Sequence, residues 1–391
     1  MQNLELRTTK LNKMNTEILN KIANKKLTRI TAAEIDEAAK AILEAVAEIT
    51  SLPSGEEQIA QLNLRFGFLK NSLLHLTAKF ADAESTETIL KISATNPEDT
   101  FGIVNARDEG FFTPLHFAAH SGDPLVAKLL LDAGAENNPQ ASTENRHWTP
   151  IHYAARFGHA DVVETLINAS VDKEVKTRFG LTPLLVGAEF GQLRVVKLML
   201  KLRANKNAQT VADNHCMNAL HYAVVGNFRD VVITLLKAGI NREQKTNSDL
   251  SALDLAIQSD QPDMVTTLLT WGVGNIDHAF KFATEIKSNH SLERIKHYRV
   301  ARKNLFDATW LMKFSKELTE TLKKCDQTNF GEVVIVPSAN APLNACGILA
   351  LQHEVGFFSK STETFSQFCA KTQLTNIVLI LRAIEQMLPK S

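Results

Sequence analysis

A short pattern recurs six times between Ser72 and Asp254 and constrains the fold more than any other feature of this chain. Each copy, called an anchor below, begins with Ser, Thr or Asn and has Leu or Ile at its third position. The six anchors are Ser72-Leu73-Leu74-His75, Thr113-Pro114-Leu115-His116, Thr149-Pro150-Ile151-His152, Thr182-Pro183-Leu184-Leu185, Asn218-Ala219-Leu220-His221 and Ser251-Ala252-Leu253-Asp254. Their first residues are 41, 36, 33, 36 and 33 positions apart. A period near 33 residues indicates an array of structural repeats that bury their apolar side chains against one another.

The residues after each anchor predict two helices. Thr is a natural N-cap and Pro fits the first helical position, so a helix begins at the anchor. Small residues stand five and six positions on: Ala118-Ala119, Ala154-Ala155, Gly187-Ala188, Ala223-Val224 and Ala256-Ile257. Gly122, Gly158 and Gly191 stand nine positions on, where a left-handed C-cap ends the helix, and Asn227 and Asp260 replace them later. Apolar residues at helical spacing, such as those from Val162 to Ile167, then predict a second helix.

The period and the Thr-Pro-Leu-His anchors resemble those of the ankyrin-repeat family over about residues 70–290. The resemblance implies an all-α solenoid of about six helix–turn–helix repeats joined by short hairpin fingers. It also implies structural roles for His75, His116, His152 and His221, each bonded to its own anchor and to the adjoining hairpin. The function that it implies is binding of another protein, without chemistry in the array itself.

Departures from the pattern mark individual repeats. Leu185 stands where the anchor His is expected, and the sixth anchor lacks both Pro and His. The 41-residue first step predicts an extended second helix or finger around Ser85 to Phe101. We interpret repeats two to four as well formed and the first and last as degenerate ends, where arrays tolerate irregularity.

The expected domain organisation is a helical N-terminal cap at 1–70, the array at 71–290 and a mainly helical C-terminal module or cap at 291–391. Thr31 and Glu34 form a capping box before one helix, and a second helix is expected from Glu56 to Leu69. A partner-binding helix is the alternative for this segment. The stretch from Arg294 to Lys303 is basic. We interpret it as a solvated helix face, and a patch for acidic lipid or RNA is the alternative.

Composition narrows the function classes. Lys and Arg number 43 and so do Asp and Glu, which does not favour nucleic-acid binding. The N-terminal stretch is polar and no run of 18 apolar residues occurs, so neither a secretory signal nor a membrane span is expected. The four cysteines lack Cys-x-x-Cys spacing. We expect a cytoplasmic monomer without cofactor or metal.

One site could carry chemistry. Cys346 stands at the start of an expected helix, where a thiolate is favoured, but the downstream His353 lies about two turns away along that helix. A buried structural Cys is the preferred interpretation, and no enzyme activity is expected. The alternative is an enzyme whose module at 300–391 is catalytic while the repeats recruit a substrate protein. The composition also resembles that of bacterial effectors delivered into host cells.

The resemblance to ankyrin repeats places the partner on the concave face, formed by finger tips and by positions seven and eight after each anchor. The candidate protein-binding residues are Phe112, His120, Arg146, Trp148, Arg156, Phe157, Arg178, Phe179, Glu189, Phe190, His215 and Met217. Aromatic and Arg side chains dominate interface energies, and Trp148, Phe157, Phe179 and Phe190 gather in repeats three and four. Packing between neighbouring fingers is the alternative role of these rings.

Overall fold

The computed structural model describes residues 13–25, 31–95, 97–142, 147–211 and 215–305. The chain divides into two compact regions, 1–240 and 241–391, and the second is described up to residue 305. Among the described residues the structure is helical, with only isolated β-bridges. The first region contains α2 (Lys13–Ala23), α3 (Ala32–Thr50), α4 (Gly55–Leu62), α5 (Leu73–Lys79), α6 (Ala83–Ser93), α7 (Pro97–Val104), α8 (Pro114–Ser121), α9 (Pro124–Asp132), α10 (Pro150–Phe157), α11 (Ala160–Asn168), α12 (Pro183–Glu189), α13 (Leu193–Lys201), α14 (Ala219–Val225) and α15 (Arg229–Lys237).

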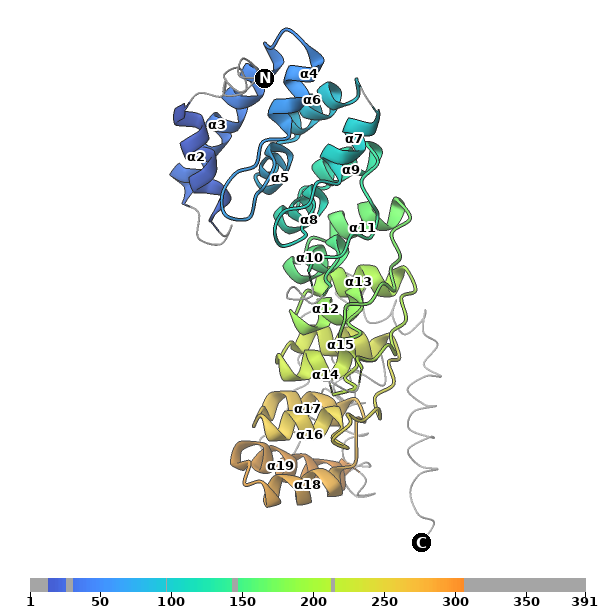
Figure 1. Cartoon of the computed structure of the whole chain (residues 1–391). Coiled ribbons are helices and arrows are strands. Elements are labelled where there is room, and N and C mark those ends of the chain that lie inside the picture. Colours follow the sequence, from blue (N-terminus) through green and yellow to red (C-terminus); the bar gives the residue numbers. More distant parts are fainter. Residues whose placement is uncertain (1–12, 26–30, 96, 143–146, 212–214, 306–391) are drawn as a thin grey trace, which may run out of the picture. The chain divides into compact units, whose positions relative to one another are not determined.

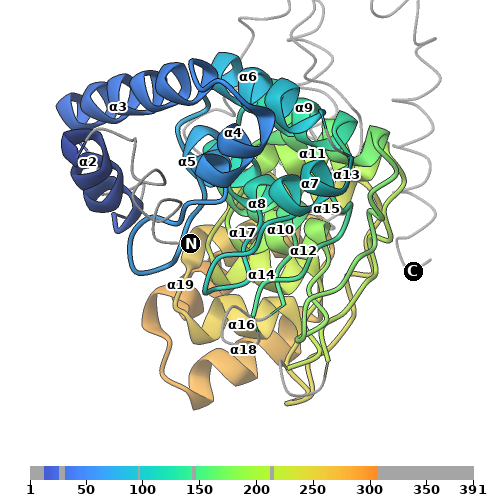
Figure 2. The same ribbon diagram turned by 45° about the horizontal axis from the view of Figure 1, so that its top comes forward.

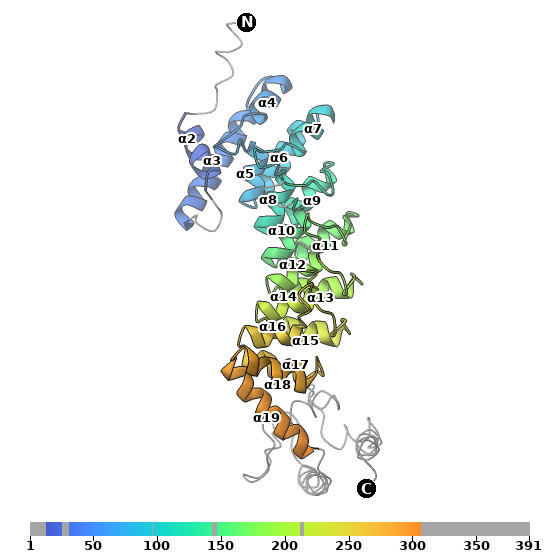
Figure 3. The same cartoon turned by 60° about the horizontal axis from the view of Figure 1, so that its bottom comes forward.

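The second region contains α16 (Ala252–Gln258), α17 (Pro262–Thr270), α18 (Ile276–Glu285) and α19 (Asn289–Leu305). Each anchor begins the first helix of a pair, called the inner helix here, and the outer helix follows it. In the first region the inner helices α5, α8, α10, α12 and α14 are stacked on one side and the outer helices beside them (Figures 1 and 3). This arrangement confirms the predicted all-α array of helix pairs.

The predicted small residues and apolar stripes form the core. Ala154 and Ala155 of α10 are fully buried, as are Val162, Val163 and Leu166 of α11. The small side chains let inner helices approach one another, while the larger ones of the outer helices fill the space between pairs.

The anchor histidines link neighbouring repeats, as predicted. In repeat three, the backbone N–H of Thr149 donates to Nδ1 of His152 over 3.2 Å, and the Thr149 hydroxyl lies 2.8 Å from the same nitrogen. Because Nδ1 accepts, the proton of the neutral ring is on Nε2, which donates to the carbonyl of Leu181 over 3.0 Å. Leu181 directly precedes the next anchor. His75 and His116 make the same bonds to the carbonyls of Phe112 and Trp148.

Repeats that depart from the anchor sequence keep its geometry. In the sixth anchor, Asp254 accepts from the Ser251 N–H over 3.0 Å and from its hydroxyl over 2.7 Å, so a carboxylate oxygen replaces the imidazole nitrogen. In the fourth, the Thr182 hydroxyl accepts from the N–H of Leu185. The fourth and sixth repeats therefore depart from the pattern in sequence more than in the geometry of the anchor.

The residue nine positions after each anchor has a left-handed backbone in all six repeats. The φ values are 57° for Ala81, 89° for Gly122, 80° for Gly158, 69° for Gly191, 57° for Asn227 and 45° for Asp260. In the middle repeats Gly is required for a second reason, because the next repeat covers it. A Cβ on Gly122 would overlap the His159 ring, and one on Gly191 would overlap the Phe228 ring.

The fingers explain why steps of 33 and 36 residues alternate. In the finger before repeat four, the N–H of Thr177 donates to the carbonyl of Leu181, four residues on. In the finger before repeat five, the N–H of Thr210 donates to the carbonyl of Met217, seven residues on. The three additional residues therefore lie inside the hairpin and leave the helices unchanged. Figure 2 shows these fingers side by side along one edge of the helix pairs.

The N-terminal segment confirms some predictions and corrects one. The Thr31–Glu34 capping box begins α3, and the extended first repeat contains the additional helix α7. The helix expected to run from Glu56 to Leu69 ends at Leu62, however. The following residues form a turn with Gly67 and Lys70 at positive φ, and the side chain of Asn20 accepts from the N–H of Gly67. Long-range bonds to α2 thus override the local helical pattern.

Lys79 joins α2 to the first repeat. Its side chain is buried, and its Nζ donates to the carbonyls of Ile22, Ala23 and Lys25 over 3.0, 3.4 and 2.6 Å. These carbonyls belong to the C-terminal end of α2, where a cation is favoured. Burial lowers the pKa of Lys79 to about 8.

In the second region, Asp260 connects the end of α16 to the start of α19. Its carboxylate accepts from the Ser288 hydroxyl over 2.7 Å and from the Ser291 N–H over 2.9 Å, and it lies 2.6 Å from Nδ1 of His290. These bonds hold the pKa of Asp260 below its usual range. In the basic stretch of α19, Arg294, Lys296, His297 and Arg299 are exposed, and Arg294 pairs with Asp263. The elements predicted after Leu305, with Cys346 and His353, lie outside the described residues.

Candidate protein-interaction surface

Helical spacing brings three positions of every inner helix to one face. Residues seven and eight after an anchor lie three and four positions beyond residue four, so both are its neighbours on the helix surface. The finger residue directly before the anchor lies beside them. In repeats two to four this set, called the inner-helix face, comprises Phe112, Phe117, His120, Ser121, Trp148, Tyr153, Arg156, Phe157, Leu181, Val186, Glu189 and Phe190.

Aromatic rings form a connected series along this face. Each ring centroid lies within 6.4 Å of the next, in edge-on geometry, in the order His75, Phe117, Phe112, Tyr153, Trp148 and Phe190. Edge-on pairs of this kind contribute about 0.5–1.5 kcal/mol beyond the area that they bury. The series therefore connects repeats one to four and leaves half-buried rings at the surface.

The side chain of Arg156 lies over two rings of this series and over the ring of Phe157. Its guanidinium carbon is 4.7 Å from the Phe190 ring centroid, 5.5 Å from that of Phe157 and 5.6 Å from that of Trp148. His120 contacts Phe157 with a centroid separation of 4.2 Å. Trp148, Tyr153, Arg156, Phe157, Phe190 and His120 are called the Arg156 cluster below. It joins α8, α10 and α12 with the finger before α10.

The charge of the Arg156 cluster resides on one group. Burial and the nearby His159 and Arg156 lower the pKa of His120 to about 4, so its ring is neutral at pH 7. Burial raises the pKa of Tyr153 to about 12. Arg156 itself is exposed and positively charged. The cluster is thus an apolar surface with a single cation at its centre.

The structure brings half of the predicted binding residues together. His120, Trp148, Arg156, Phe157 and Phe190 belong to the cluster, and Phe112 contacts it through Tyr153 at 5.7 Å between centroids. Trp148 is only 4% exposed, so it lies beneath Arg156 as a support.

The other predicted residues lie elsewhere. Glu189 is half-buried on α12, at the position equivalent to Arg156. Arg178 is exposed in the finger before α12, above the ring of its neighbour Phe179. His215 is exposed in the next finger, where Met217 is half-buried. Arg146 lies outside the described residues.

Tyr153 is the cluster residue that the sequence analysis missed. Its ring contacts Phe112, His116, His120 and Trp148, at centroid separations of 5.3–6.5 Å. The signal that could have found it is its position, four residues after the anchor and one helical turn before Phe157. Positions seven and eight alone describe only the end of the face.

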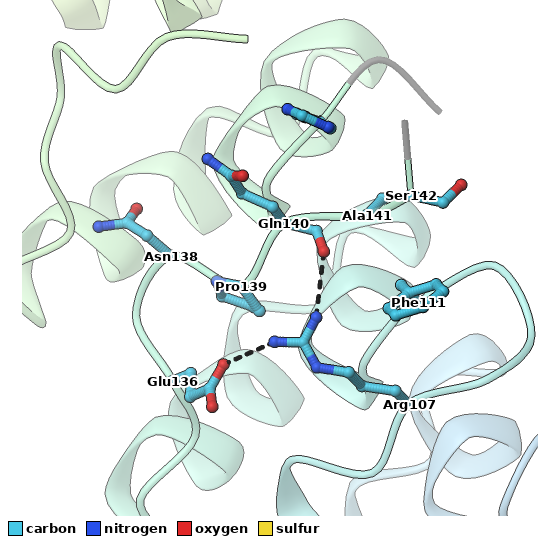
Figure 4. A pocket seen from close by; sticks show the side chains of 9 residues that line it. Arg107, Phe111, Glu136, Asn138, Pro139, Gln140, Ala141 and Ser142 are labelled. Atoms are coloured by element: carbon cyan, nitrogen blue, oxygen red, sulfur yellow. Dashed lines mark hydrogen bonds and ion pairs between the residues drawn. The ribbon is translucent and has the colours of Figure 1, made fainter. Parts of the chain in front are cut away.

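A separate hollow lies between the fingers that precede repeats two and three (Figure 4). Arg107 crosses it, donating to a Glu136 carboxylate oxygen over 3.0 Å and to the Gln140 carbonyl over 3.1 Å. Phe111 and Pro139 line its sides. Two nitrogens of the Arg107 guanidinium already have acceptors, so its charge is paired. The side chain therefore links the two fingers across the hollow.

Two family models match the array. "Ankyrin repeat" matches residues 111–143, and "Ankyrin repeats (3 copies)" matches residues 138–210. Together they cover the anchors of repeats two, three and four, whose helix pairs, left-handed caps and fingers are described above. The helix pairs of residues 111–210 thus match ankyrin repeats. Such repeats are in general protein–protein interaction modules, and the inner-helix face of repeats two to four carries the half-buried rings of Phe157 and Phe190.

Several known proteins are similar to part of the chain. Human neurogenic locus notch homolog protein 2 is 33% identical over 135 residues, which are 34% of this chain and 5% of that protein. The chicken nuclear factor NF-kappa-B p105 subunit is 26% identical over 209 residues, 53% of this chain and 17% of that protein. Mouse Rabankyrin-5 is 32% identical over 162 residues, which are 41% of this chain and 14% of that protein. This chain thus matches less than a fifth of each relative, and the resemblance to bacterial effectors stays a prediction.

Two further findings concern the described residues alone. None of their helices combines the length and the apolar character needed to cross a bilayer. No group of three or more His, Cys, Asp and Glu side chains among them is arranged to hold a metal ion.

Proposed function

We propose that this chain is a non-catalytic binding protein whose ankyrin repeats two to four grip a partner protein through the inner-helix face. The observation that carries the proposal is the Arg156 cluster, in which three rings hold an exposed guanidinium. Buried or half-buried aromatic residues beside Arg are the composition of interface hot spots. The other faces of these repeats carry ordinary ion pairs, such as Arg194 with Asp161.

The rigidity of the cluster supports the same proposal. Each ring is held by neighbours from other helices, so little side-chain entropy is lost when a partner binds. The backbone beneath is fixed as well, since Gln192 of the next repeat donates to the Arg156 carbonyl over 2.8 Å. A preorganised surface binds more tightly than a mobile one of equal area.

Replacement of Arg156, Phe157, Glu189 and Phe190 together by Ala tests the proposal. The partner is first isolated by affinity capture with the full chain and then purified. Since each hot-spot residue contributes roughly 1–4 kcal/mol, its affinity should fall at least about a thousandfold. Arg194→Ala with Lys197→Ala on the exposed side of α13 is the matched control. If the fourfold variant binds the partner as tightly as the wild type does, the binding site lies outside the inner-helix face.

A further inference from the structure

Arg156 differs from the paired arginines of this protein in its surroundings. Four arginines lie 2.9–3.3 Å from a carboxylate oxygen: Arg107, Arg194, Arg294 and Arg299. Among the described residues no carboxylate lies within ion-pair distance of the Arg156 guanidinium, and its near neighbours are the rings of Trp148, Phe157 and Phe190. A positive charge is thus held in place without an anion.

Stacking on rings leaves the hydrogen-bonding edge of Arg156 available. Aromatic rings contact the flat face of a guanidinium, whereas its five N–H donors point outward in the guanidinium plane. A carboxylate accepts two of these bonds in parallel, which is a strong, charge-assisted pairing. The apolar floor of the Arg156 cluster reduces competition from water and strengthens such a pair.

The charge around Arg156 fits one carboxylate better than a doubly charged phosphate. His120 is neutral at pH 7, and Glu189 occupies the equivalent position on the adjoining helix. The next cation along the inner-helix positions is Lys79, whose ammonium is bonded to three carbonyls at the end of α2. Among the described residues of this face, no second cation is therefore free to neutralise a dianion.

The rings around Arg156 indicate which kind of ligand residue lies next to the carboxylate-bearing one. Phe157 and Phe190 are half-buried on neighbouring repeats, and both contact the guanidinium. A ligand chain that places a carboxylate over Arg156 brings its neighbouring side chains onto these rings, where apolar groups gain most.

We propose that the Arg156 cluster recognises an Asp or Glu side chain in a linear segment of the partner protein, with apolar or aromatic residues on either side of it. The inference rests on the proposed function and adds the chemistry of the ligand. Charge complementarity to a preoriented guanidinium, which has no carboxylate partner within the described part of the chain, carries it.

The test uses the full chain to select from a display library of random linear peptides. Wild-type protein and the control Arg194→Gln should enrich peptides with an acidic residue at one position between apolar residues. Arg156→Gln should lose the acidic preference, and Arg156→Glu should replace it with Lys or Arg. Enrichment without an acidic position, or no enrichment, would overturn the inference.

A synthetic peptide from the selection then separates this inference from the proposed function. Arg156→Gln should weaken its binding about tenfold to a hundredfold, and Asp→Asn or Glu→Gln in the peptide should do the same without adding to that loss. If Phe157→Ala with Phe190→Ala abolishes binding while Arg156→Gln leaves it unchanged, the partner binds the inner-helix face but the recognition of a carboxylate by Arg156 is refuted. If neither variant weakens binding, the proposed function fails as well. Tighter binding of a phosphorylated peptide would contradict the assignment of a single carboxylate.

Discussion

Gly122 lies directly beneath the imidazole of His159, and the two residues close the contact between repeats two and three. The His159 Nε2 is 3.1 Å from the carbonyl of His120, two residues before the glycine. Gly158 and Gln192 repeat this relationship one step along the array, where the Gln192 side-chain amide donates to the Arg156 carbonyl. The glycine at this position therefore provides a left-handed cap and makes room for the next repeat.

A matched pair of glycines separates these two roles. Gly122 and Gly134 have φ values of 89° and 90°, but a Cβ on Gly134 would meet no atom within 4 Å. Gly134→Ala should cost about 1–2 kcal/mol of unfolding free energy through the backbone alone. Gly122→Ala should cost clearly more, because the His159 ring must move. Urea unfolding measures both, and equal losses would show that the ring adapts freely.

Acid should weaken the array through its anchor histidines. Burial lowers the pKa of His75 and His116 to about 3 and that of His152 to about 4. The unfolded chain binds these protons near pH 6.5 and the folded chain does not, so stability is complete above pH 6.5 and falls as the pH drops from there toward 4. Each histidine contributes a slope of up to about 1.4 kcal/mol per pH unit.

His152→Leu tests this acid dependence, since Leu185 occupies the same position in repeat four. The variant should be less stable at pH 7, because the Leu181 carbonyl loses its donor. Its loss of stability between pH 7 and pH 5 should nevertheless be smaller than that of the wild type. The free energy of unfolding is measured for both proteins at both pH values. If the variant loses as much stability between pH 7 and pH 5 as the wild type, His152 is not a buried ring that stays neutral in the folded state.

Asp260→Gly introduces the residue that ankyrin repeats prefer and should still destabilise the second region. Glycine removes the strain of a φ of 45°, worth about 1 kcal/mol. It also removes the acceptor for the Ser288 hydroxyl and the Ser291 N–H, which costs about 1–3 kcal/mol for each bond. Hydrogen exchange should show faster opening of residues 288–292. Asp260→Asn keeps an acceptor oxygen, so its stability should lie between those of the wild type and the glycine variant. A glycine variant more stable than the wild type would refute the role of Asp260 as an acceptor.

Lys79→Met should release α2 from the first repeat while the remaining repeats stay folded. The substitution keeps a long apolar stem but leaves the carbonyls of Ile22, Ala23 and Lys25 without their donor, a loss of about 1–3 kcal/mol. Limited proteolysis should then cut within residues 13–25 sooner than in the wild type. Lys91→Met, on the exposed side of α6, is the control; equal cutting rates in both variants would show that Lys79 does not hold α2.

The sequence by itself determined the repeats, the helix pairs and their caps. These features depend on short-range or periodic patterns: a Thr at an N-cap, Ala154 and Ala155 on one helical face, a left-handed residue nine positions after an anchor. It also indicated Arg156, Phe157 and Phe190, because their positions recur within the period.

Only the tertiary structure decided which rings meet and which local patterns fail. Tyr153 joins Phe112 to Trp148 because neighbouring repeats bring a finger and an inner helix together. The helix predicted to reach Leu69 ends at Leu62, where Asn20, 47 residues from Gly67, competes for the backbone. Such contacts join residues with no fixed spacing along the chain. Their free energy comes from burial and hydrogen bonds that exist only once the repeats are stacked.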